Sequence, residues 1–327
     1  MEAGIHQKLK FLYLAQIFER ETDEEHTLTI YDLLERLEAL GIKASRKTLL
    51  EDIHLLSDFG MDIIPISCGK KLGYYLGSRS FELPEIKLLA DAVSSARFIT
   101  EKKSRQLLSK LEGLTSVHRG REINRRVYVA NRIKSENELI YINIDLIQQA
   151  IDRKKQITFR YFDRTVGMKK KYRSGGRSCS PFALAWNDGS YYLVGKQKKY
   201  TTLSNFRIDR MENVEILSET SEPVPEGFDL AEYTATTFSM FSGEQRNVTL
   251  CLDNSLVNVA ADRFGTDVIL IPCGEDKFTM NVKVVAAPAF YGWLFQFGDK
   301  AEILSPESVR NEFLEMMDNI RGKYIKE

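Results

Sequence analysis

The sequence contains few cysteines, and no two of them are close together. Four occur in 327 residues, namely Cys68, Cys179, Cys251 and Cys273. Zinc ribbons and redox motifs need two thiols a couple of residues apart, so we expect reduced thiols and no metal site. The N-terminal residues lack an apolar leader, and no run approaches the roughly 20 apolar residues of a membrane span. We therefore expect a cytoplasmic protein that has no membrane partner.

Histidine is equally scarce, and no catalytic motif accompanies it. None of the four histidines stands at metal-ligand spacing from another; they are His6, His26, His54 and His118. The sequence has no nucleophile elbow, no Walker loop and no dinucleotide fingerprint. We predict that the protein is not an enzyme and uses no cofactor. Hydrolysis of a nucleotide is the enzymatic alternative.

Charge is balanced in sum but not along the chain. The sequence has 46 Lys and Arg against 46 Asp and Glu. Residues 102–134 hold ten Lys or Arg against two Glu, and residues 153–177 hold ten against one Asp. Residues 218–327 reverse this ratio, with nine Lys or Arg against eighteen Asp or Glu. A basic first part and an acidic last part favour a polyanion-binding region and a region with another role. Solvated helix faces are the alternative for each basic run.

The first sixty residues have the pattern of three helices. Apolar residues recur at helical spacing over 6–19. Thr29 can cap a second helix, which Gly41 ends. Ser45 can cap a third helix, whose buried face would consist of Leu49, Ile53 and Leu56. The opposite face of this third helix would be polar and exposed.

Two β-prone segments, 61–67 and 73–76, follow these helices and flank a basic turn. They predict a hairpin with a cationic tip. Three helices and a hairpin predict a winged helix-turn-helix domain over residues 1–80, with its third helix sized for the major groove. The start of this helix favours anions through its amide dipoles. The candidate contacts to double-stranded DNA are Ser45, Arg46, Lys47, Thr48, Glu51, Lys70 and Lys71. A helix cap with solvated charges is the alternative.

Helical spacing returns over 84–114 and predicts a helical connector over residues 81–138. Residues 139–219 then begin with a short helix, 145–154, and continue with five β-rich segments between turn residues. These segments are 157–162, 179–186, 190–196, 203–208 and 214–217. Five short strands predict a small SH3-like or OB-like barrel.

The last third predicts one more domain. A linker over residues 220–245 contains Pro223 and Pro225. The pattern over 246–327 then predicts the order βαββαβ with an added helix, which is ferredoxin-like. The predicted fold class is a multi-domain α+β protein.

The predicted barrel carries candidates for an anion site. Strand alternation would place Arg207 and Asp209 on one face and Arg210 on the other. Asp209 could orient an arginine through a bidentate pair. The candidate ligand residues are Tyr161, Tyr191, Tyr192, Arg207, Asp209 and Arg210. A purely structural Arg and Asp pair with core tyrosines is the alternative. A basic run that we expect to be a mobile loop could close over a polyanion or be simply solvated; it contains Lys169, Lys170, Lys171, Arg173 and Arg177.

Three stretches together resemble the WYL-domain transcriptional regulators, over nearly the whole chain. The first is SRKTLLEDIHLLSDFGMDI at 45–63, similar to their recognition helix and wing entry. The second joins YYLVGK at 191–196 with NFRIDRM at 205–211, preceded by ITFRYFD and SPFAL. The third is GWLFQFGDKAEILSPESVR at 292–310, which resembles the C-terminal extension of that family.

The resemblance implies an SH3-like WYL barrel and the sensing of a nucleotide or single-stranded nucleic acid. Two residues depart from the family pattern. Tyr191 replaces the tryptophan that names the motif, and Glu51 stands where relatives often have a basic residue. We therefore expect a homodimeric, ligand-responsive regulator that binds DNA. The alternative is an RNA-binding or nucleotide-sensing accessory factor, for example in phage defence, that binds no operator.

Overall fold

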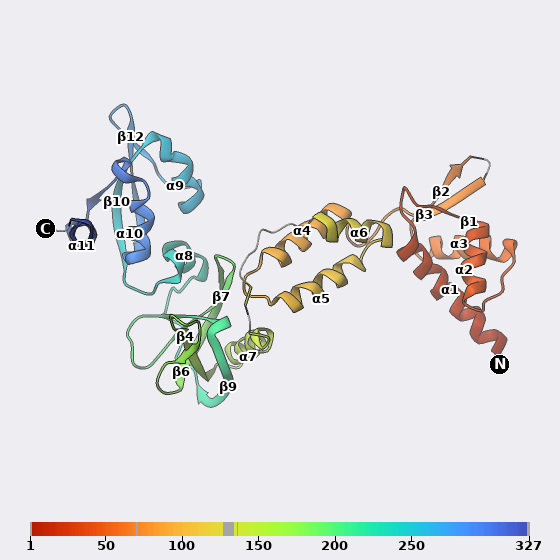
Figure 1. The fold of residues 1–327 in the computed structure, drawn as a ribbon, viewed down its shortest axis with the longest axis horizontal. Helices are drawn as coiled ribbons and strands as arrows, with labels where there is room; N and C mark the ends of the chain where they lie inside the picture. Colours follow the sequence, from red (N-terminus) through yellow and green to blue (C-terminus); the bar gives the residue numbers. More distant parts are fainter. Residues whose placement is uncertain (1, 70, 127–133, 136, 326–327) are drawn as a thin grey trace. The chain divides into compact units, whose positions relative to one another are not determined.

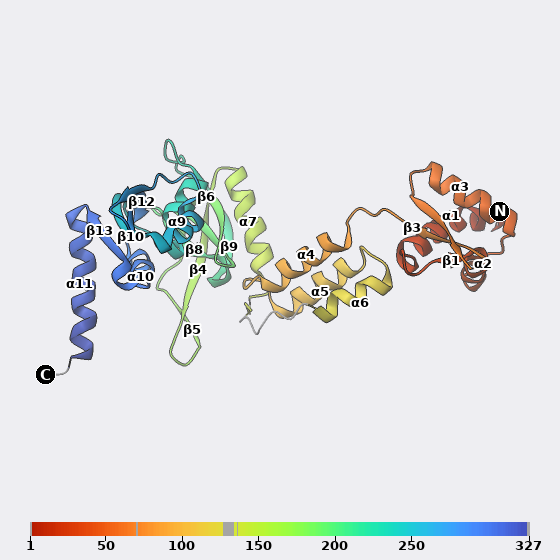
Figure 2. The same ribbon diagram turned by 90° about the horizontal axis from the view of Figure 1, so that it is seen from above.

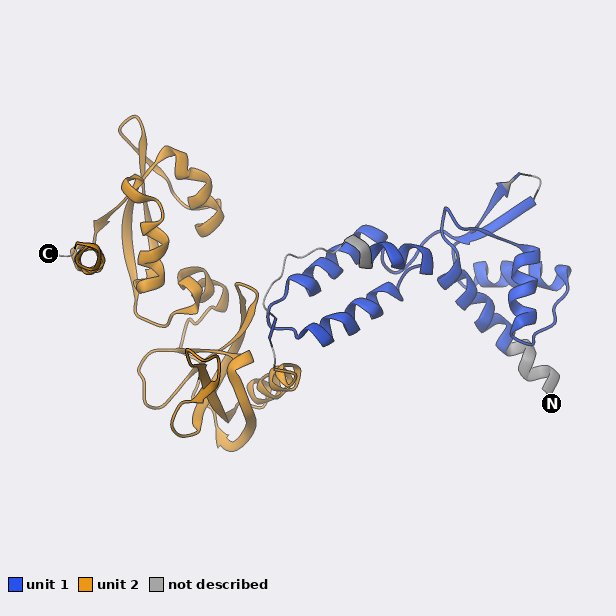
Figure 3. Cartoon of the chain, viewed as in Figure 1, with its two compact units in different colours: residues 1–135 blue, residues 136–327 orange. Residues whose placement is uncertain are grey.

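The computed structural model describes residues 2–69, 71–126, 134–135 and 137–325. Contacts divide the chain into two compact units, Met1–Ser135 and Glu136–Glu327 (Figure 3). The structure is a mixed α+β fold with three separate sheets (Figure 1). The finer division into five segments stays a prediction. Within the described ranges, no helix combines the length and apolar content of a membrane span.

The first unit begins with three helices, α1 (Glu2–Glu21), α2 (Ile30–Ala39) and α3 (Arg46–Asp58). The expected caps are confirmed. They could be predicted from sequence because a cap depends only on neighbouring residues. Thr29 forms a reciprocal capping box with Asp32, and Ser45 forms one with Thr48. Gly41, at a φ of 77°, follows α2. The apolar faces of the helices meet in one core that includes Leu14, Phe18, Leu33, Leu37 and Leu49.

A three-stranded sheet follows the helices. Strands β2 (Ile63–Cys68) and β3 (Lys71–Leu76) form the expected antiparallel hairpin. The two-residue strand β1 (Leu28–Thr29) adds to the other edge of β3. Sequence reasoning missed β1 because two residues carry no periodic signal. The pairing holds the hairpin to the segment that precedes α2.

The rest of the first unit is helical, as expected. It contains α4 (Leu83–Ser95), α5 (Glu101–Glu112) and α6 (Val117–Arg126), which enclose a small core of Ile86, Ala90 and Ile123. Lys134 Nζ lies 3.1 Å from the carbonyl oxygens of Val93 and Ala96 and 2.9 Å from Ser104 Oγ. The lysine therefore fastens the end of this unit to the junction of α4 and α5.

The second unit begins with α7 (Ile140–Asp152), which starts five residues before its predicted position, and a six-stranded sheet. The strand order is β5-β4-β6-β7-β8, and β9 also pairs with β4. The strands are β4 (Lys155–Arg164), β5 (Lys170–Tyr172), β6 (Arg177–Asn187), β7 (Ser190–Lys196), β8 (Ser204–Arg207) and β9 (Met211–Thr220). This sheet curls into a half-barrel around a core of Ile157, Phe159, Leu193, Phe206 and Ile208.

Two details of this sheet correct the sequence-based expectations. Residues 170–172 form strand β5 against β4, so part of the lysine run is ordered by pairing and is not a loop. Residues 208–210 form the 3₁₀ turn η1 (Ile208–Arg210) in place of a strand. The strand alternation expected beyond Arg207 is therefore wrong. Both elements depend on contacts with distant strands, which periodicity does not report.

The helix α8 (Leu230–Thr236) and the 3₁₀ turn η2 (Phe238–Met240) lie within the expected linker. Tyr233 and Met240 pack on Ala185 and Val194 of the half-barrel. Sequence reasoning read this segment as a plain linker because its two prolines dominate the local pattern.

The last sheet confirms the predicted βαββαβ order. It contains β10 (Gln245–Asp253), β11 (Ile271–Cys273), β12 (Lys277–Val285) and β13 (Ala301–Ser305). Its strand order is β11-β12-β10-β13 with all pairs antiparallel, the order of a ferredoxin-like unit. The helices are η3 (Asn254–Leu256), α9 (Val257–Phe264), α10 (Pro288–Phe295), η4 (Gly298–Lys300) and the terminal α11 (Glu307–Tyr324). The core includes Val248, Leu250, Val284 and Phe290.

Candidate nucleic-acid interface and anion site

The helix α3 exposes a short basic edge at its start. Arg46 and Lys47 are exposed, whereas Leu49, Ile53 and Leu56 on the other face are buried. Glu51 is also exposed. Arg46 and Lys47 therefore lie where a duplex could reach them, beside the unpaired amide groups of the first helical turn.

The hydroxyl groups at this helix start already have partners. Ser45 Oγ accepts a hydrogen bond from the Thr48 amide at 3.2 Å, and Thr48 Oγ1 accepts one from the Ser45 amide at 3.1 Å. The structure thus gives Ser45 and Thr48 the capping role that was the alternative to DNA contact. The cationic side chains of the neighbouring residues remain the better candidates for phosphate contacts.

The hairpin places one of its two lysines near α2. Lys71 Nζ lies 5.7 Å from the centre of the Tyr31 ring, and the Tyr31 side chain is itself 59% exposed. A cation over an aromatic face is weakly held at an exposed site, so Lys71 stays available to an anion. Lys70 lies outside the described residues.

A polar cluster joins the α1–β1 loop to α6 in the first unit. Asp23 accepts hydrogen bonds from Ser116 Oγ and from the amides of Glu25 and His26. The rings of His26 and His118 stack with centroids 3.7 Å apart. Burial, the largest influence, raises the pKa of the Asp23 carboxyl, but the Ser116 and His26 contacts together leave it below its ordinary value. This cluster was missed because its residues lie about ninety positions apart.

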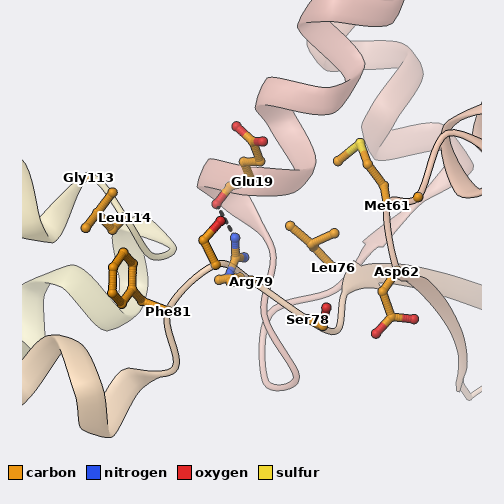
Figure 4. A pocket seen from close by; sticks show the side chains of 11 residues that line it. Glu19, Met61, Asp62, Leu76, Ser78, Arg79, Phe81, Gly113 and Leu114 are labelled. Carbon is orange, nitrogen blue, oxygen red and sulfur yellow. Dashed lines mark hydrogen bonds between the residues drawn. The ribbon is translucent and has the colours of Figure 1, made fainter.

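Arg79 lies in the connecting segment between β3 and α4 and holds this segment to the C-terminal end of α1. Its guanidinium donates to the carbonyl oxygen of Glu19 at 2.8 Å (Figure 4) and to that of Thr22 at 2.5 Å. A cation at a helix C-terminus satisfies carbonyl groups that have no partner within the helix. Beside it lies a cavity of about 460 Å³ whose lining includes Met61, Leu76 and Phe81.

The half-barrel brings together five of the six candidate ligand residues, namely Tyr161, Tyr192, Arg207, Asp209 and Arg210. Arg207 and Asp209 form a bidentate pair, with Nε–Oδ1 at 3.0 Å and Nη2–Oδ2 at 2.9 Å. Tyr161 Oη accepts a hydrogen bond from the Arg207 amide at 3.3 Å. Tyr192 pairs with Arg207 in the β7–β8 register, so their side chains share a face. The Asp209 contact raises the pKa of Arg207, which therefore stays fully charged.

Among the cations of this group, Arg210 is the one most available to a ligand. The hydrogen bond with Arg173 is the main cause of the lowered pKa of Asp163, and the charge of Arg210 adds to it. Burial raises the pKa of Tyr161, and the charge of Arg210 partly opposes that rise. Within the described part of the chain, Arg210 forms no hydrogen bond or ion pair through its side chain. Its guanidinium is therefore available to a ligand.

Two arginines of the basic run complete the cluster. Arg173 pairs with Asp163, with Nε–Oδ2 at 2.6 Å, and lies 5.1 Å from the centre of the Tyr161 ring. Arg177 Nη1 donates to Gln197 Oε1 at 3.3 Å, but its buried Nε has no hydrogen-bond partner among the described residues. A buried N–H group without a partner costs free energy, which an anionic ligand would recover. Sequence reasoning placed both arginines in a loop that could close over a polyanion but did not include them among the candidate ligand residues; Arg177 is the first residue of β6.

The structure separates Tyr191 from this cluster. Tyr191 pairs with Trp186 in the β6–β7 register, and their ring centroids lie 4.9 Å apart at 74°. Successive residues of a strand point to opposite faces, so Tyr191 and Tyr192 face opposite ways. Tyr191 therefore packs on Trp186, whose side chain is 51% exposed.

Two parts of the second unit match known protein families. Residues 143–216 match the WYL domain, and residues 244–320 match the WCX domain. The two matches cover the curled sheet and the ferredoxin-like unit, respectively. The chain thus contains the WYL and WCX domains that the sequence motifs suggested.

Sixteen chains of solved structures match this chain, among them the following two. One is the proteasome accessory factor B/C (PafBC) of Arthrobacter aurescens, with 20% identity, a TM-score of 0.30, and coverage of 97% of this chain and 49% of that one. The chain thus spans about half the length of that protein. The other is a CRISPR Cas-related protein, with 14% identity, a TM-score of 0.37, and coverage of 89% and 77%. A comparison with curated proteins finds no match.

Proposed function

We propose that the chain is a ligand-responsive transcriptional regulator. Its first unit binds double-stranded DNA through the start of α3 and the β2–β3 hairpin. Its WYL domain binds a nucleotide or a single-stranded nucleic acid at the arginine cluster. The observation that carries the DNA-binding half is the exposure of Arg46 and Lys47 at the start of a helix whose other face is buried.

The arginine cluster supports the sensing half. Arg173, Arg207 and Arg210 lie near Tyr161, and Arg177 lies over the ring of the adjacent Phe206. Among the described residues, two of these four arginines pair with a carboxylate. Arginine is suited to bidentate contact with phosphate, and a tyrosine ring gives a surface for a base. We propose no catalytic role, because the two carboxylates described at the proposed site, Asp163 and Asp209, are each engaged by an arginine. The regulator would act as a homodimer in the cytoplasm.

The deciding experiment selects bound duplexes from a random-sequence pool and then measures mobility shifts at several salt concentrations. We expect selective duplex binding by the full chain and its loss in the Arg46→Ala plus Lys47→Ala variant. The salt slope should fall by about 0.9 for each phosphate contact removed. The matched control is Lys102→Ala plus Lys110→Ala, which removes two exposed charges from α5. Equal loss in the control would refute a specific role for α3.

The second candidate function is an RNA-binding or nucleotide-sensing accessory factor. The observation that favours it is the unequal distribution of cations, since the half-barrel gathers four arginines beside Tyr161 and Phe206 whereas α3 exposes two cations and Glu51. Binding restricted to single strands, unaffected by Arg46→Ala plus Lys47→Ala, would support this function. The ultraviolet absorbance ratio and mass spectrum of purified protein would also identify any nucleotide that it retains.

A further inference from the structure

The exposed face of α3 continues beyond the basic residues at its start. Lys47, Glu51 and Leu55 follow one another at intervals of four residues, which places them in a row along one side of the helix. All three are exposed, Leu55 to 54%, whereas Asp52 and Leu56 are buried. Figure 2 shows α3 along the outer edge of the three N-terminal helices. The packing of α3 therefore presents this 47–51–55 row to solvent.

The carboxylate in the 47–51–55 row lowers the general attraction of α3 to DNA. Glu51 is repelled by phosphate groups, and within the described part of the chain it forms no ion pair that would neutralise it. Its loss of hydration is compensated only where a base edge offers a hydrogen-bond donor. In the major groove cytosine offers its N4 amino group, whereas adenine sets the N7 acceptor beside its N6 amino group. A carboxylate therefore fits cytosine best.

The apolar side chain of the row, one helical turn further along, has a different complement. The C5-methyl group of thymine is the apolar feature of the base edges in the major groove, and side-chain carbon atoms recognise it by contact. Four residues of helix rise about 6 Å, which corresponds to about two base pairs. Leu55 would therefore reach a thymine about two base pairs from the base that Glu51 contacts.

We propose that Glu51 and Leu55 determine which operator sequence the chain selects. Glu51 accepts a hydrogen bond from the N4 amino group of a cytosine, and Leu55 packs on the C5-methyl group of a thymine about two base pairs away. Lys47 supplies attraction to phosphate that does not depend on sequence. The inference rests on the proposed DNA binding by α3 and names the bases that this binding distinguishes.

Selection of bound duplexes from a random-sequence pool tests the role of Glu51. We expect the full wild-type chain to enrich a motif with a constant cytosine, and Glu51→Gln to enrich adenine at that position, because glutamine pairs with both N6 and N7 of adenine. Each protein should prefer its own duplex at least about tenfold. Glu38→Gln, which removes an exposed carboxylate from α2, is the matched control and should keep the wild-type motif. A motif that Glu51→Gln leaves unchanged would overturn the role of Glu51.

Deoxyuridine tests the role of Leu55, because its base lacks only the methyl group of thymine. Replacing the thymines of the selected duplex one at a time should weaken wild-type binding about fourfold at one position, the effect expected for one buried methyl group. Leu55→Ala should bind the thymine and uracil duplexes equally. Leu88→Ala changes an exposed leucine of α4 and should retain the difference. Equal wild-type binding at every position, or a difference that persists in Leu55→Ala, would overturn the role of Leu55.

The same measurements separate these roles from DNA binding itself. A wild-type chain that enriches no motif would refute operator binding by α3 and the base contacts with it. A motif that needs Arg46 and Lys47 but is identical for the wild type, Glu51→Gln and Leu55→Ala would support operator binding and refute the two base contacts alone. Circular dichroism melts verify that each variant is folded.

Discussion

Lys10 of α1 and Asp52 of α3 form an ion pair inside the first unit, with Nζ and Oδ2 2.6 Å apart. The two side chains are only 5% and 7% exposed. A buried charge is tolerated only beside an opposite one, because removal from water is costly. The pair therefore ties the helix that carries Arg46 and Lys47 to the first helix of the chain.

Replacing one member of this pair should destabilise the first unit. We expect Asp52→Ala to lower its free energy of unfolding by about 3 kcal/mol, because Lys10 would be left buried and unpaired. Denaturant unfolding followed by circular dichroism measures the change. Glu51→Ala is the control, since its exposed neighbouring carboxylate should alter stability by no more than about 0.5 kcal/mol. Similar losses for the two variants would contradict the assignment.

Gly195 of β7 should not tolerate a side chain. A Cβ atom there would lie 2.5 Å from the Ser180 carbonyl oxygen and 2.7 Å from Cys179 Sγ. The carbonyl oxygen belongs to the backbone of the paired strand β6, so it cannot move without the strand. We expect Gly195→Ala to destabilise the half-barrel by about 1–3 kcal/mol. Thermal unfolding measures this, with Gly292→Ala as the control because no atom lies within 4 Å of its added Cβ.

The Arg207–Asp209 pair should matter more for ligand affinity than for folding. Arg207→Lys keeps the charge but loses the bidentate geometry. We expect it to weaken binding of a labelled single-stranded DNA oligonucleotide at least about tenfold, corresponding to about 1.4 kcal/mol, in fluorescence anisotropy. Lys199→Arg, a conservative change at an exposed position, is the control. Unchanged affinity in Arg207→Lys would remove Arg207 from the proposed site.

The Asp23 cluster should make stability depend on pH in the acidic range. The folded-state pKa of Asp23 lies below its ordinary value, so the unfolded chain takes up this proton first as the pH falls. The contribution of Asp23 is therefore complete above about pH 4 and is lost as the pH falls through the folded-state pKa. We expect the free energy of unfolding of Asp23→Asn to vary less over this range. A wild-type slope retained in Asp23→Asn would show that other carboxyls are responsible.

Sequence predicted those parts of the fold that depend on neighbouring residues. The caps at Thr29 and Ser45 need a partner three residues away, and the βαββαβ order follows from local periodicity. In contrast, β1 and β5 exist because a distant strand pairs with them. Such short strands have no signal of their own, so no periodic pattern could reveal them.

The features of the candidate sites also divide into those that a local motif could reveal and those that depend on distant contacts. The Arg207–Asp209 pair joins residues two apart, and its geometry was accessible to reasoning about the motif. The open Nε of Arg177 depends on how β6 packs beside the core, which sequence does not report. Tyr191 was a candidate because it occupies the aromatic position of the family motif, but adjacent strand residues point to opposite faces, so it does not share the face of Tyr192.

The segment that carries Asp209 also anchors the chain where it enters the second unit. Asn137 Nδ2 donates to the carbonyl oxygens of Asp209 and Met211 at 3.3 and 3.1 Å, and Asn143 Nδ2 donates to Met211 at 2.9 Å. Any displacement of the 208–210 turn must stretch these amide bonds or carry Asn137 with it. The 208–210 turn and the first residues of the second unit consequently move together.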